Sequence, residues 1–317
     1  MTLPDPTLSA TAPSAPPSIT VVILTFNEEV HIARALDSVV GLAQRVVVVD
    51  SGSRDATQAI ARARGVEIYE HPFLNYADQF QWALDHTDIA TDWILRLDAD
   101  EVIEPDLRAR IVAELPCLPS SVAAVNFDLM YVIMGRRIRH GGRYPLILLR
   151  LFRRGQGRIE QRWMDEHIIV EGGDTIRMRG GFSHIELKDL TFFTTKHNAY
   201  ATREAVDAIA KRYGLFPAQG SAQISRQAAR TRFIKERIYN HLPLGVGPFL
   251  YFLYRYFLRL GFLDGREGAI YHVLQGFWYR YLVDAKVFEL EKEMRARGAD
   301  TPETRRCALS ELTGYKL

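Results

Sequence analysis

Apolar and polar positions alternate in blocks along the first hundred residues. Each block is a continuous apolar run that ends in polar residues and is followed by apolar positions at helical spacing. The expected strands lie at residues 18–26, 45–50, 66–72 and 92–100, and the expected helices at 32–40, 56–64 and 76–87. Strands and helices that alternate at this pace predict an α/β fold with a mostly parallel sheet covered by helices on both faces.

The composition narrows the class of protein. A hydrophobic content of 47% over 317 residues is ample for a buried core, and a net charge of +2 gives no reason to expect a nucleic-acid partner. Cys117 and Cys307 are too far apart in sequence to suggest a disulfide framework or a zinc site, which is typical of a reducing cytoplasm. Residues 1–17 are rich in Pro, Ala, Ser and Thr and predict a disordered tail, not a secretion signal. No run of about 18 apolar residues indicates a transmembrane helix.

Polar side chains gather where the expected strands end. They are Thr25, Asn27, Asp50, Ser51, Asp98 and Asp100. In open α/β sheets, ligands bind at the carboxyl ends of the strands. The pattern therefore predicts a binding site at this edge of the sheet.

The stretch WILRLDADE places two carboxylates directly after an apolar run. Successive strand side chains alternate between faces, so Asp98 and Asp100 are expected on one side and Ala99 on the other. Hard oxygen ligands of this kind suit Mg²⁺ or Mn²⁺ that bridges a nucleotide diphosphate. The alternative is that the acids cap the turn, an interpretation we favour only for Glu104 and Asp106 in the first turn of the next helix.

Three segments in series resemble the family 2 glycosyltransferases of the GT-A fold, within them the subgroup that builds bacterial lipopolysaccharide core or exopolysaccharide. They are VVILTFNEEVHIARALDSV, VVVVDSGSRDAT and WILRLDADE, and the likeness is tight over residues 18–107 and looser beyond. The resemblance implies inverting transfer of a sugar from a nucleoside diphosphate donor, UDP-hexose foremost, with Mg²⁺ or Mn²⁺ as cofactor. It implies a lipid-linked, lipopolysaccharide or exopolysaccharide acceptor.

The resemblance also implies roles for individual residues. Thr25, Asn27 and Glu28 are expected to border the nucleotide, Asp50 with Ser51 to hold its uracil or ribose, and Asp98 and Asp100 to carry ribose and metal. The alternative for Asp50 is a turn-forming residue before Ser-Gly. Where many members have a basic residue before an Asn, this chain reads Gln79-Phe80-Gln81, so a usual diphosphate contact is absent. We assign Gln79 to the donor site.

A transferase of this kind needs a base that removes the proton of the acceptor hydroxyl. The stretch RWMDEHIIVEGG offers Asp165 and Glu166, and Glu166 matches the acid of the family best, with Asp165 as its rival. Both could instead belong to a charged turn. His184, in GGFSHIELKDL, matches a histidine that completes the metal or diphosphate site in GT-A enzymes; a structural role is the alternative.

The last third of the chain, residues 191–317, is expected to be helical, basic and aromatic. Its basic residues include Arg226, Arg230, Arg232, Lys235 and Arg237, and PFLYFLYRYFLRLGFLDG follows at 248–265. Arg255 and Arg259 are four apart and are predicted to share one helical face. The composition favours a helix at a membrane interface, against a core helix or a dimer contact.

These expectations divide the chain into three parts: a tail at 1–17, a GT-A catalytic domain at 18–190, and a membrane-associating region at 191–317. Within the catalytic domain, residues 18–107 bind the nucleotide sugar and residues 108–190 form the acceptor side. The expected location is cytoplasmic, peripheral on the inner face of the plasma (inner) membrane. The rival hypothesis is a catalytically idle GT-A module that binds polysaccharide or membrane, against which the D-x-D and the downstream acid both count.

Overall fold

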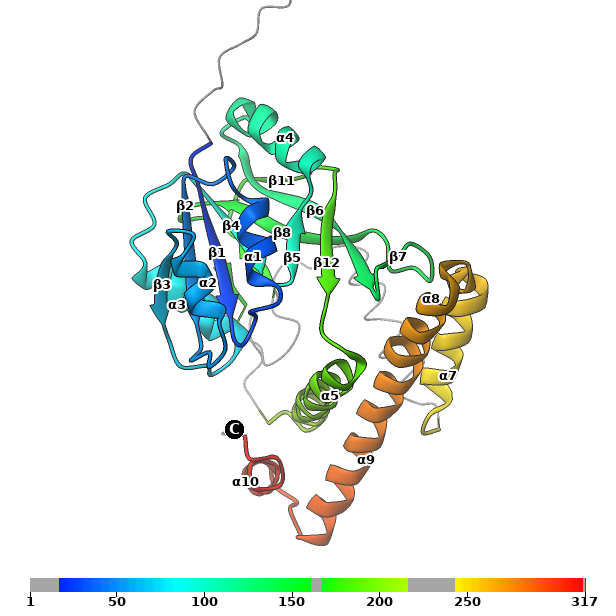
Figure 1. Cartoon of the computed structure of the whole chain (residues 1–317). Helices are drawn as coiled ribbons and strands as arrows, with labels where there is room; N and C mark the ends of the chain where they lie inside the picture. Colours follow the sequence, from blue (N-terminus) through cyan, green and yellow to red (C-terminus); the bar gives the residue numbers. More distant parts are fainter. Residues whose placement is uncertain (1–16, 161–166, 216–242, 316) are drawn as a thin grey trace, which may run out of the picture.

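The computed structural model describes residues 17–160, 167–215, 243–315 and 317. Within these residues, ten strands form one sheet in the order β3-β2-β1-β4-β8-β6-β12-β5, and β7 and β11 pair with β6 (Figure 1). The predicted bases Asp165 and Glu166 and the basic residues at 226–237 lie outside the described residues.

The elements follow the expected alternation. The strands are β1 (Ile19–Thr25), β2 (Arg45–Asp50), β3 (Glu67–Glu70), β4 (Trp93–Asp98), β5 (Glu101–Ile103), β6 (Val122–Ile133), β7 (Arg136–Ile138), β8 (Leu146–Arg153), β9 (Gly157–Ile159), β10 (Ile168–Val170), β11 (Asp174–Arg177) and β12 (Phe182–Glu186). The first helices are α1 (Ile32–Ser38), α2 (Thr57–Arg62), α3 (Tyr76–His86), α4 (Pro105–Glu114) and η1 (Leu115–Cys117). The later ones are α5 (Leu190–Tyr213), α7 (Val246–Leu253), η3 (Tyr254–Leu258), η4 (Gly261–Asp264), α8 (Gly265–Tyr271), η5 (His272–Trp278), α9 (Tyr279–Ala296) and α10 (Pro302–Thr313).

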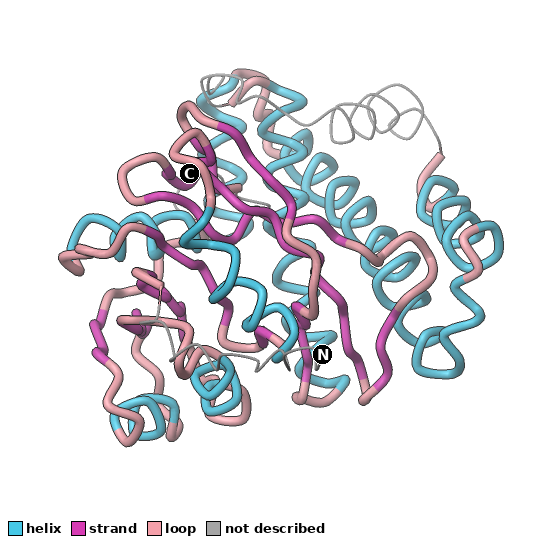
Figure 2. The backbone as a smooth tube through the Cα atoms, turned by 90° about the horizontal axis from the view of Figure 1, so that it is seen from above, coloured by secondary structure: helices cyan, strands magenta, loops and turns pink. Residues whose placement is uncertain are grey.

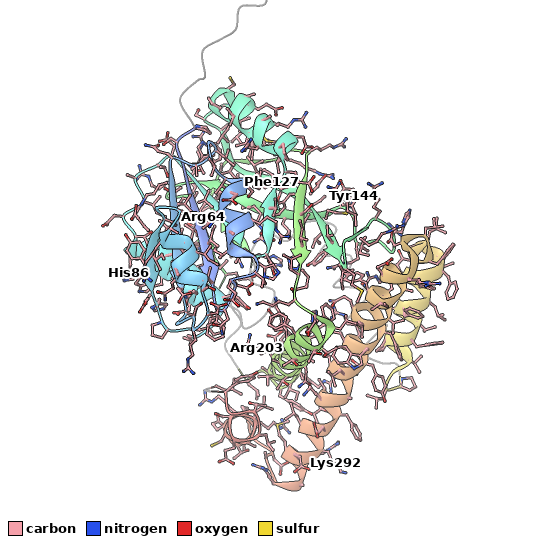
Figure 3. The ribbon with its side chains drawn as sticks, in the orientation of Figure 1. Arg64, His86, Phe127, Tyr144, Arg203 and Lys292 are labelled. Atoms are coloured by element: carbon pink, nitrogen blue, oxygen red, sulfur yellow. The ribbon has the colours of Figure 1, made fainter. Side chains whose placement is uncertain are left out.

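The valine-rich strands are buried on both faces because their side chains serve two separate cores. Val21 and Ile23 of β1 pack into a cluster with α1, α2 and α4, whereas Val22 packs into a second cluster with α3. Alternate side chains of a strand point to opposite faces, so one apolar run fills both layers. Phe127 of β6, labelled in Figure 3, belongs to the first cluster and is fully buried.

The sheet is parallel in its first half and mixed in its second. Strand β1 pairs in parallel with β2 and β4, and β2 pairs in parallel with β3. Strand β8 then runs antiparallel to β4 and β6, while β12 runs parallel to β6 and antiparallel to β5. The predicted α/β fold is confirmed, with its mostly parallel part at β3, β2, β1 and β4.

The predicted helical C-terminal extension is also confirmed. From Leu190 onward the described chain is helical, and Figure 2 shows the C-terminal helices grouped beside the sheet. Helices α5, α9 and α10 share an apolar cluster that includes Val206, Leu290 and Leu309. A second contact joins Tyr271 of α8 to Ile133 and Ile138 at β6 and β7. No helix among the described residues has the length and apolar character needed to cross a membrane.

Candidate functional site

The carboxyl ends of β1 and β2 are bound to each other by the side chain of Asp50. Its carboxylate is fully buried and accepts hydrogen bonds from Thr25 Oγ1 (2.8 Å), Ser53 N (2.8 Å) and Gln58 Nε2 (2.8 Å). Burial alone would raise the pKa of Asp50, but a hydrogen bond from Ser53 Oγ together with these donors lowers it below its ordinary value. Ser51 N completes the link by donating to Thr25 O (2.9 Å). Asp50 therefore organises this turn, and its contact with a base or ribose stays a prediction.

The loop after β1 contains a residue in the left-handed backbone conformation and is bonded to the loop after β2. Asn27 has φ 55°, and its Oδ1 accepts a hydrogen bond from Arg54 N (2.9 Å) in the loop after β2. Lys188, just beyond β12, donates to Asn27 O (2.8 Å) and to Glu28 Oε1 (3.0 Å). The loops after β1, β2 and β12 thus form one rim. Gln79 is buried in α3 and donates to a backbone carbonyl, so its assignment to the donor also stays a prediction.

The clustered acids after β4 are compensated by arginines. Arg150 Nη2 of β8 lies 3.0 Å from Asp98 Oδ2 and 2.5 Å from Glu101 Oε1. Arg96 Nε lies 3.4 Å from the other oxygen of Asp98, and Asp98 N donates to Glu101 Oε2 (3.0 Å). Burial, with Asp98 and Asp100 nearby, raises the pKa of Glu101 to about 7 against the opposing effect of Arg150. The sequence offered no local signal for Arg150, which reaches these acids from a distant strand.

Asp100 faces a different set of partners, on β12 and α5. Its Oδ1 lies 3.2 Å from His184 Nδ1, and its Oδ2 lies 3.8 Å from Lys196 Nζ. Burial would raise the pKa of Asp100, but His184 and Lys196 lower it far below its ordinary value. Burial would likewise lower the pKa of His184, and the Asp100 carboxylate raises it overall. Asp100 is therefore a carboxylate held ionised inside the protein.

Asp100, His184 and Glu186 form a group that could hold a metal ion. One ligand atom from each lies within 4.8 Å of the others. Two carboxylates with one imidazole fit Mn²⁺ or Mg²⁺, which prefer oxygen ligands and leave positions open for phosphate oxygens. The structure thus brings together two of the predicted metal residues, Asp100 and His184. Asp98 stands outside this group, with its oxygens in ion pairs to Arg150 and Arg96, and its metal role stays a prediction.

Glu186 was not singled out from the sequence, although a signal was present. His184 and Glu186 are two apart on β12, so the strand period places both on one face. Glu186 is also linked to the loop after β1, because His31 Nε2 lies 3.4 Å from Glu186 Oε1 and His31 Nδ1 lies 2.6 Å from Glu28 Oε2. Glu28 is therefore linked through His31 to Glu186, and its contact with the nucleotide stays a prediction.

Helix α5 follows β12 and lies beyond the end of that strand (Figure 1), and its Lys196 and Tyr200 contact residues at the strand ends and in α3. Lys196 Nζ lies 5.9 Å from the centre of the Tyr200 ring, and Tyr200 Oη lies 3.0 Å from Tyr76 Oη at the start of α3. Arg203, labelled on α5 in Figure 3, lies with Cζ 5.7 Å from the ring of the exposed Phe73. These contacts join α5 to the loop before α3 on the far side of the rim.

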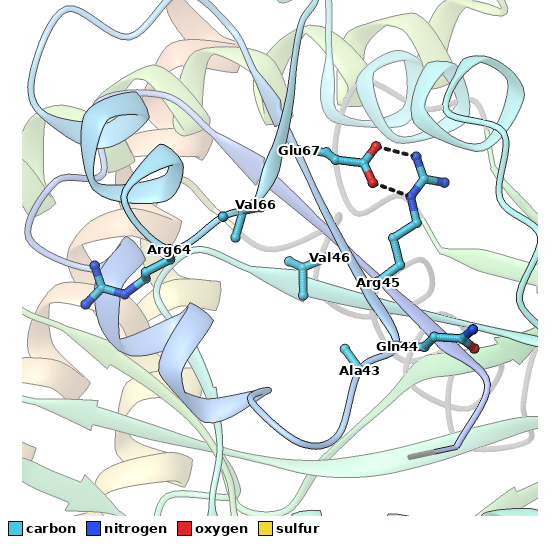
Figure 4. Close-up of a pocket in the computed structure, with 8 residues that line it drawn as sticks. Ala43, Gln44, Arg45, Val46, Arg64, Val66 and Glu67 are labelled. Atoms are coloured by element: carbon cyan, nitrogen blue, oxygen red, sulfur yellow. Dashed lines mark hydrogen bonds and ion pairs between the residues drawn. The ribbon is translucent and has the colours of Figure 1, made fainter. Parts of the chain in front are cut away.

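A shallow pocket lies at the opposite end of the strands (Figure 4). Its lining includes Arg45 and Glu67, the first residues of β2 and β3, which form an ion pair at 2.7 Å. Because ligands of α/β sheets bind at the carboxyl ends of the strands, this pocket at the amino ends is not the donor site.

Comparison with known proteins identifies the class. The model of glycosyl transferase family 2 matches residues 20–185, more than half of the chain, and the protein belongs to this family. A lipopolysaccharide core biosynthesis glycosyltransferase, LpsC of Rhizobium meliloti (strain 1021), is 27% identical over 277 residues, which cover 86% of this chain and 92% of that protein. The predicted family is confirmed.

Other similar proteins match only part of the chain. An uncharacterized glycosyltransferase of Rickettsia bellii (strain RML369-C) is 41% identical over 93 residues, which are 29% of this chain and 31% of that protein. The chain thus matches less than a third of the length of that relative. A crystal structure of glucosyl-3-phosphoglycerate synthase from Mycobacterium tuberculosis, with Mn²⁺, UDP-glucose and phosphoglyceric acid, shares 24% identity. It has a TM-score of 0.31 and covers 36% of this chain and 44% of that chain.

Proposed function

We propose that the protein is an inverting, metal-dependent hexosyltransferase that moves a sugar from a nucleoside diphosphate donor, UDP-hexose, to a lipid-linked or lipopolysaccharide acceptor. The observation that carries this proposal is the group of Asp100, His184 and Glu186 at the carboxyl ends of β4 and β12. It borders the rim formed by the loops after β1 and β2, where the family segments predict the nucleotide.

The residues of the site have separate proposed roles. A bound Mg²⁺ or Mn²⁺ would supply positive charge to the diphosphate leaving group. Lys196 adds a cation that is held beside Asp100 without depending on the metal. Asp50 and Asn27 hold the loops after β1 and β2 in one conformation, so that little conformational entropy is lost when a nucleotide binds. Glu166, or its rival Asp165, is the proposed base on the acceptor side.

The acceptor is proposed to reach the site from a membrane surface. Large apolar side chains are exposed along α7, η3 and η4. They are Phe249, Leu250, Tyr254, Phe257, Leu258, Leu260, Phe262 and Leu263, which we call the apolar surface. Exposed Arg259 and Arg266 lie within the same segment and would face anionic lipid head groups. This surface supports the proposed peripheral position on the cytoplasmic face of the inner membrane, and the relative LpsC, named for lipopolysaccharide core biosynthesis, supports the proposed acceptor.

One expectation about this segment was wrong. Arg255 and Arg259 do not share an exposed face: Arg255 is buried and Arg259 is exposed. The turn Tyr254–Leu258 is π-helical, with a wider repeat than the α-helix on which the expectation was based. Arg255 therefore does not belong to the exposed face that would meet lipid head groups.

The test is a donor screen with the purified protein. Release of nucleoside diphosphate is measured for UDP-glucose, UDP-galactose and their GDP and ADP counterparts, with Mg²⁺, Mn²⁺ or EDTA, with and without bacterial membrane lipid. We expect UDP release that requires metal and rises with lipid acceptor. A protein that binds membrane yet releases no diphosphate under any of these conditions supports the idle GT-A module instead.

A further inference from the structure

The buried Arg255 and the half-buried Arg143 lie together without an acidic partner among the described residues. Among the described residues, neither Arg143 nor Arg255 has a carboxylate in ion-pair contact. Arg255 has only 2% of its surface exposed, and Arg143 repels it closely enough to add to the lowering of the Arg255 pKa that burial causes. Buried like charges destabilise a fold unless a counter-charge is supplied.

The polar atoms around these guanidinium groups are left without partners. In the part of the chain that the structure describes, Arg143 Nε, Arg255 Nη2 and Tyr271 Oη are buried and make no hydrogen bond of normal geometry, although Tyr271 Oη lies near both guanidinium groups. Buried donors without partners are rare in folded proteins and destabilise them, so their combination in one place indicates a ligand. Tyrosine rings cover the cations, with Arg143 Cζ 4.5 Å from the centre of Tyr131 and Arg255 Cζ 5.8 Å from that of Tyr271. Ring faces attract cations but leave the in-plane N–H donors free.

The C-terminal helices hold this cluster in place. Arg255 Nε donates to Gly141 O (3.0 Å), and Asp264 Oδ2 accepts from His140 N (2.9 Å) in the same loop between β7 and β8. Gly141 has φ +68°, and a Cβ there would lie 2.1 Å from the ring of His272, so only glycine fits. The donors are therefore fixed before any ligand arrives.

The cluster adjoins the metal group through Tyr131. Tyr131 lies between them, with its ring centre 4.9 Å from that of His184 and 6.1 Å from that of Tyr271. Arg255 Cζ also lies 5.5 Å from the ring centre of the exposed Tyr251, which is next to Leu250 of the apolar surface in sequence. The cluster thus lies between the residues of the metal group and the exposed Tyr251.

We propose that Arg143, Arg255 and Tyr271 bind an anionic group of the acceptor, a phosphate or a carboxylate. The inference rests on the proposed function and names its acceptor as acidic. Planar guanidinium groups with a neighbouring hydroxyl match the oxygens of such an anion, which also supplies the missing counter-charge.

The experiment measures anion binding and not transfer, so its result is separate from the donor screen. Inorganic phosphate is titrated calorimetrically into the wild-type protein in EDTA at constant ionic strength. We expect binding that is about tenfold weaker in Arg255→Gln and in Arg143→Gln. Arg259→Gln, which removes the same charge from an exposed position on the same segment, is the matched control and is expected to bind phosphate like the wild type. Absence of phosphate binding to the wild type, or equal loss in the control, overturns the proposal.

A second titration decides between acceptor and donor. UDP with Mn²⁺ is expected to bind the Arg255→Gln variant as it binds the wild type, whereas a parallel loss of UDP and phosphate affinity would assign the cluster to the donor diphosphate and overturn the proposal. Glucose 6-phosphate, galacturonate and dioctanoyl phosphatidate then compete against inorganic phosphate. Competition by a sugar acid points to a core sugar, and competition by phosphatidate points to a lipid phosphate; competition by none of them overturns the acceptor assignment.

Two further variants guard against simple misfolding. Tyr271→Phe removes only the hydroxyl that makes no hydrogen bond of normal geometry, so its thermal stability is expected to match the wild type while phosphate binding weakens. Arg255→Lys keeps the charge and is expected to recover part of the affinity. Full phosphate affinity in a folded Tyr271→Phe variant together with no recovery in Arg255→Lys would reduce the cluster to a structural role.

Discussion

His184 Nδ1 lies 3.2 Å from Asp100 Oδ1, an ion pair between the end of β12 and the turn that follows β4. Strand β12 reaches this position because it pairs in parallel with β6 and antiparallel with β5. Two residues far apart in sequence thereby converge where the metal is proposed to bind, and they supply the first prediction.

Replacing Asp100 with Asn removes the central carboxylate and keeps the size of the side chain. We expect metal-dependent UDP release to fall by about a hundredfold or more, because a missing metal ligand leaves the diphosphate charge uncompensated. Steady-state assays at saturating Mn²⁺ measure it. Asp106→Asn, an exposed acid in the first turn of α4, is the control, and undiminished turnover in Asp100→Asn refutes the metal assignment.

Glu186→Gln tests the ligand that the structure added. We expect the dissociation constant of Mn²⁺, followed by electron paramagnetic resonance, to rise about tenfold, since one of three protein ligands loses its charge. Glu171→Gln changes an exposed glutamate after β10 and is expected to leave Mn²⁺ binding unaltered. Equal affinity in the two variants would remove Glu186 from the site.

The choice of base is tested by Glu166→Gln and Asp165→Asn. The base acts on the acceptor in the transition state, so its loss is expected to abolish transfer while the dissociation constant of UDP with Mn²⁺ stays within about twofold of the wild type. We expect this pattern for Glu166→Gln. The same pattern in Asp165→Asn alone would exchange the two assignments.

The apolar surface predicts binding to lipid vesicles. Phe257 and Leu258 expose 53% and 76% of their surfaces, and replacing both with Ser is expected to weaken co-sedimentation with phosphatidylcholine vesicles by about 2 kcal/mol. Val40→Ser, at a 66% exposed position after α1, is the control. On vesicles with anionic lipid, high salt should weaken the binding of the wild type and of the double variant alike, because salt screens the charges of Arg259 and Arg266. If the wild-type protein stays in solution with both kinds of vesicle, the apolar surface does not bind lipid and is better explained as a contact with another protein.

His272 predicts a loss of stability in acid. Burial, then the nearby Arg255 and Arg143, lower its pKa to about 4, against the opposing effect of Asp264, whose carboxylate lies 3.7 Å from Nε2. The folded state therefore binds a proton less readily than the unfolded state, whose pKa is near 6.5. The stabilisation is complete above about pH 6.5 and is lost as the pH falls toward about 4.

Through His272, the unfolding free energy of the wild type is expected to fall by about 2 kcal/mol when the pH is lowered from about 7 to about 5. Urea denaturation of His272→Gln at both values should show a smaller change than the wild type by this amount, whatever the variant loses in overall stability. His86→Gln, at an exposed position in α3, should keep the wild-type change. An identical pH dependence in His272→Gln would contradict the prediction.

The local pattern of the sequence determined the first half of the fold and part of the site. Alternation along β1 places Val21 and Val22 in different cores, and this requires only the strand period. The polar ends of successive parallel strands must meet at one edge of a sheet, which brought Thr25 and Asp50 into contact as expected. Family segments then selected Asp100 and His184 without knowledge of their distance.

Only the tertiary structure decided which charges meet. Arg150 neutralises Asp98 and Glu101 because β8 runs antiparallel beside β4, a pairing between distant segments that local periodicity does not encode. Arg255 reads as an exposed cation in an aromatic helix, yet a π-helical turn and the close approach of Gly141 bury it beside Arg143. Burial and charge pairing depend on which surfaces the folded chain brings together, and that is settled by packing over the whole molecule.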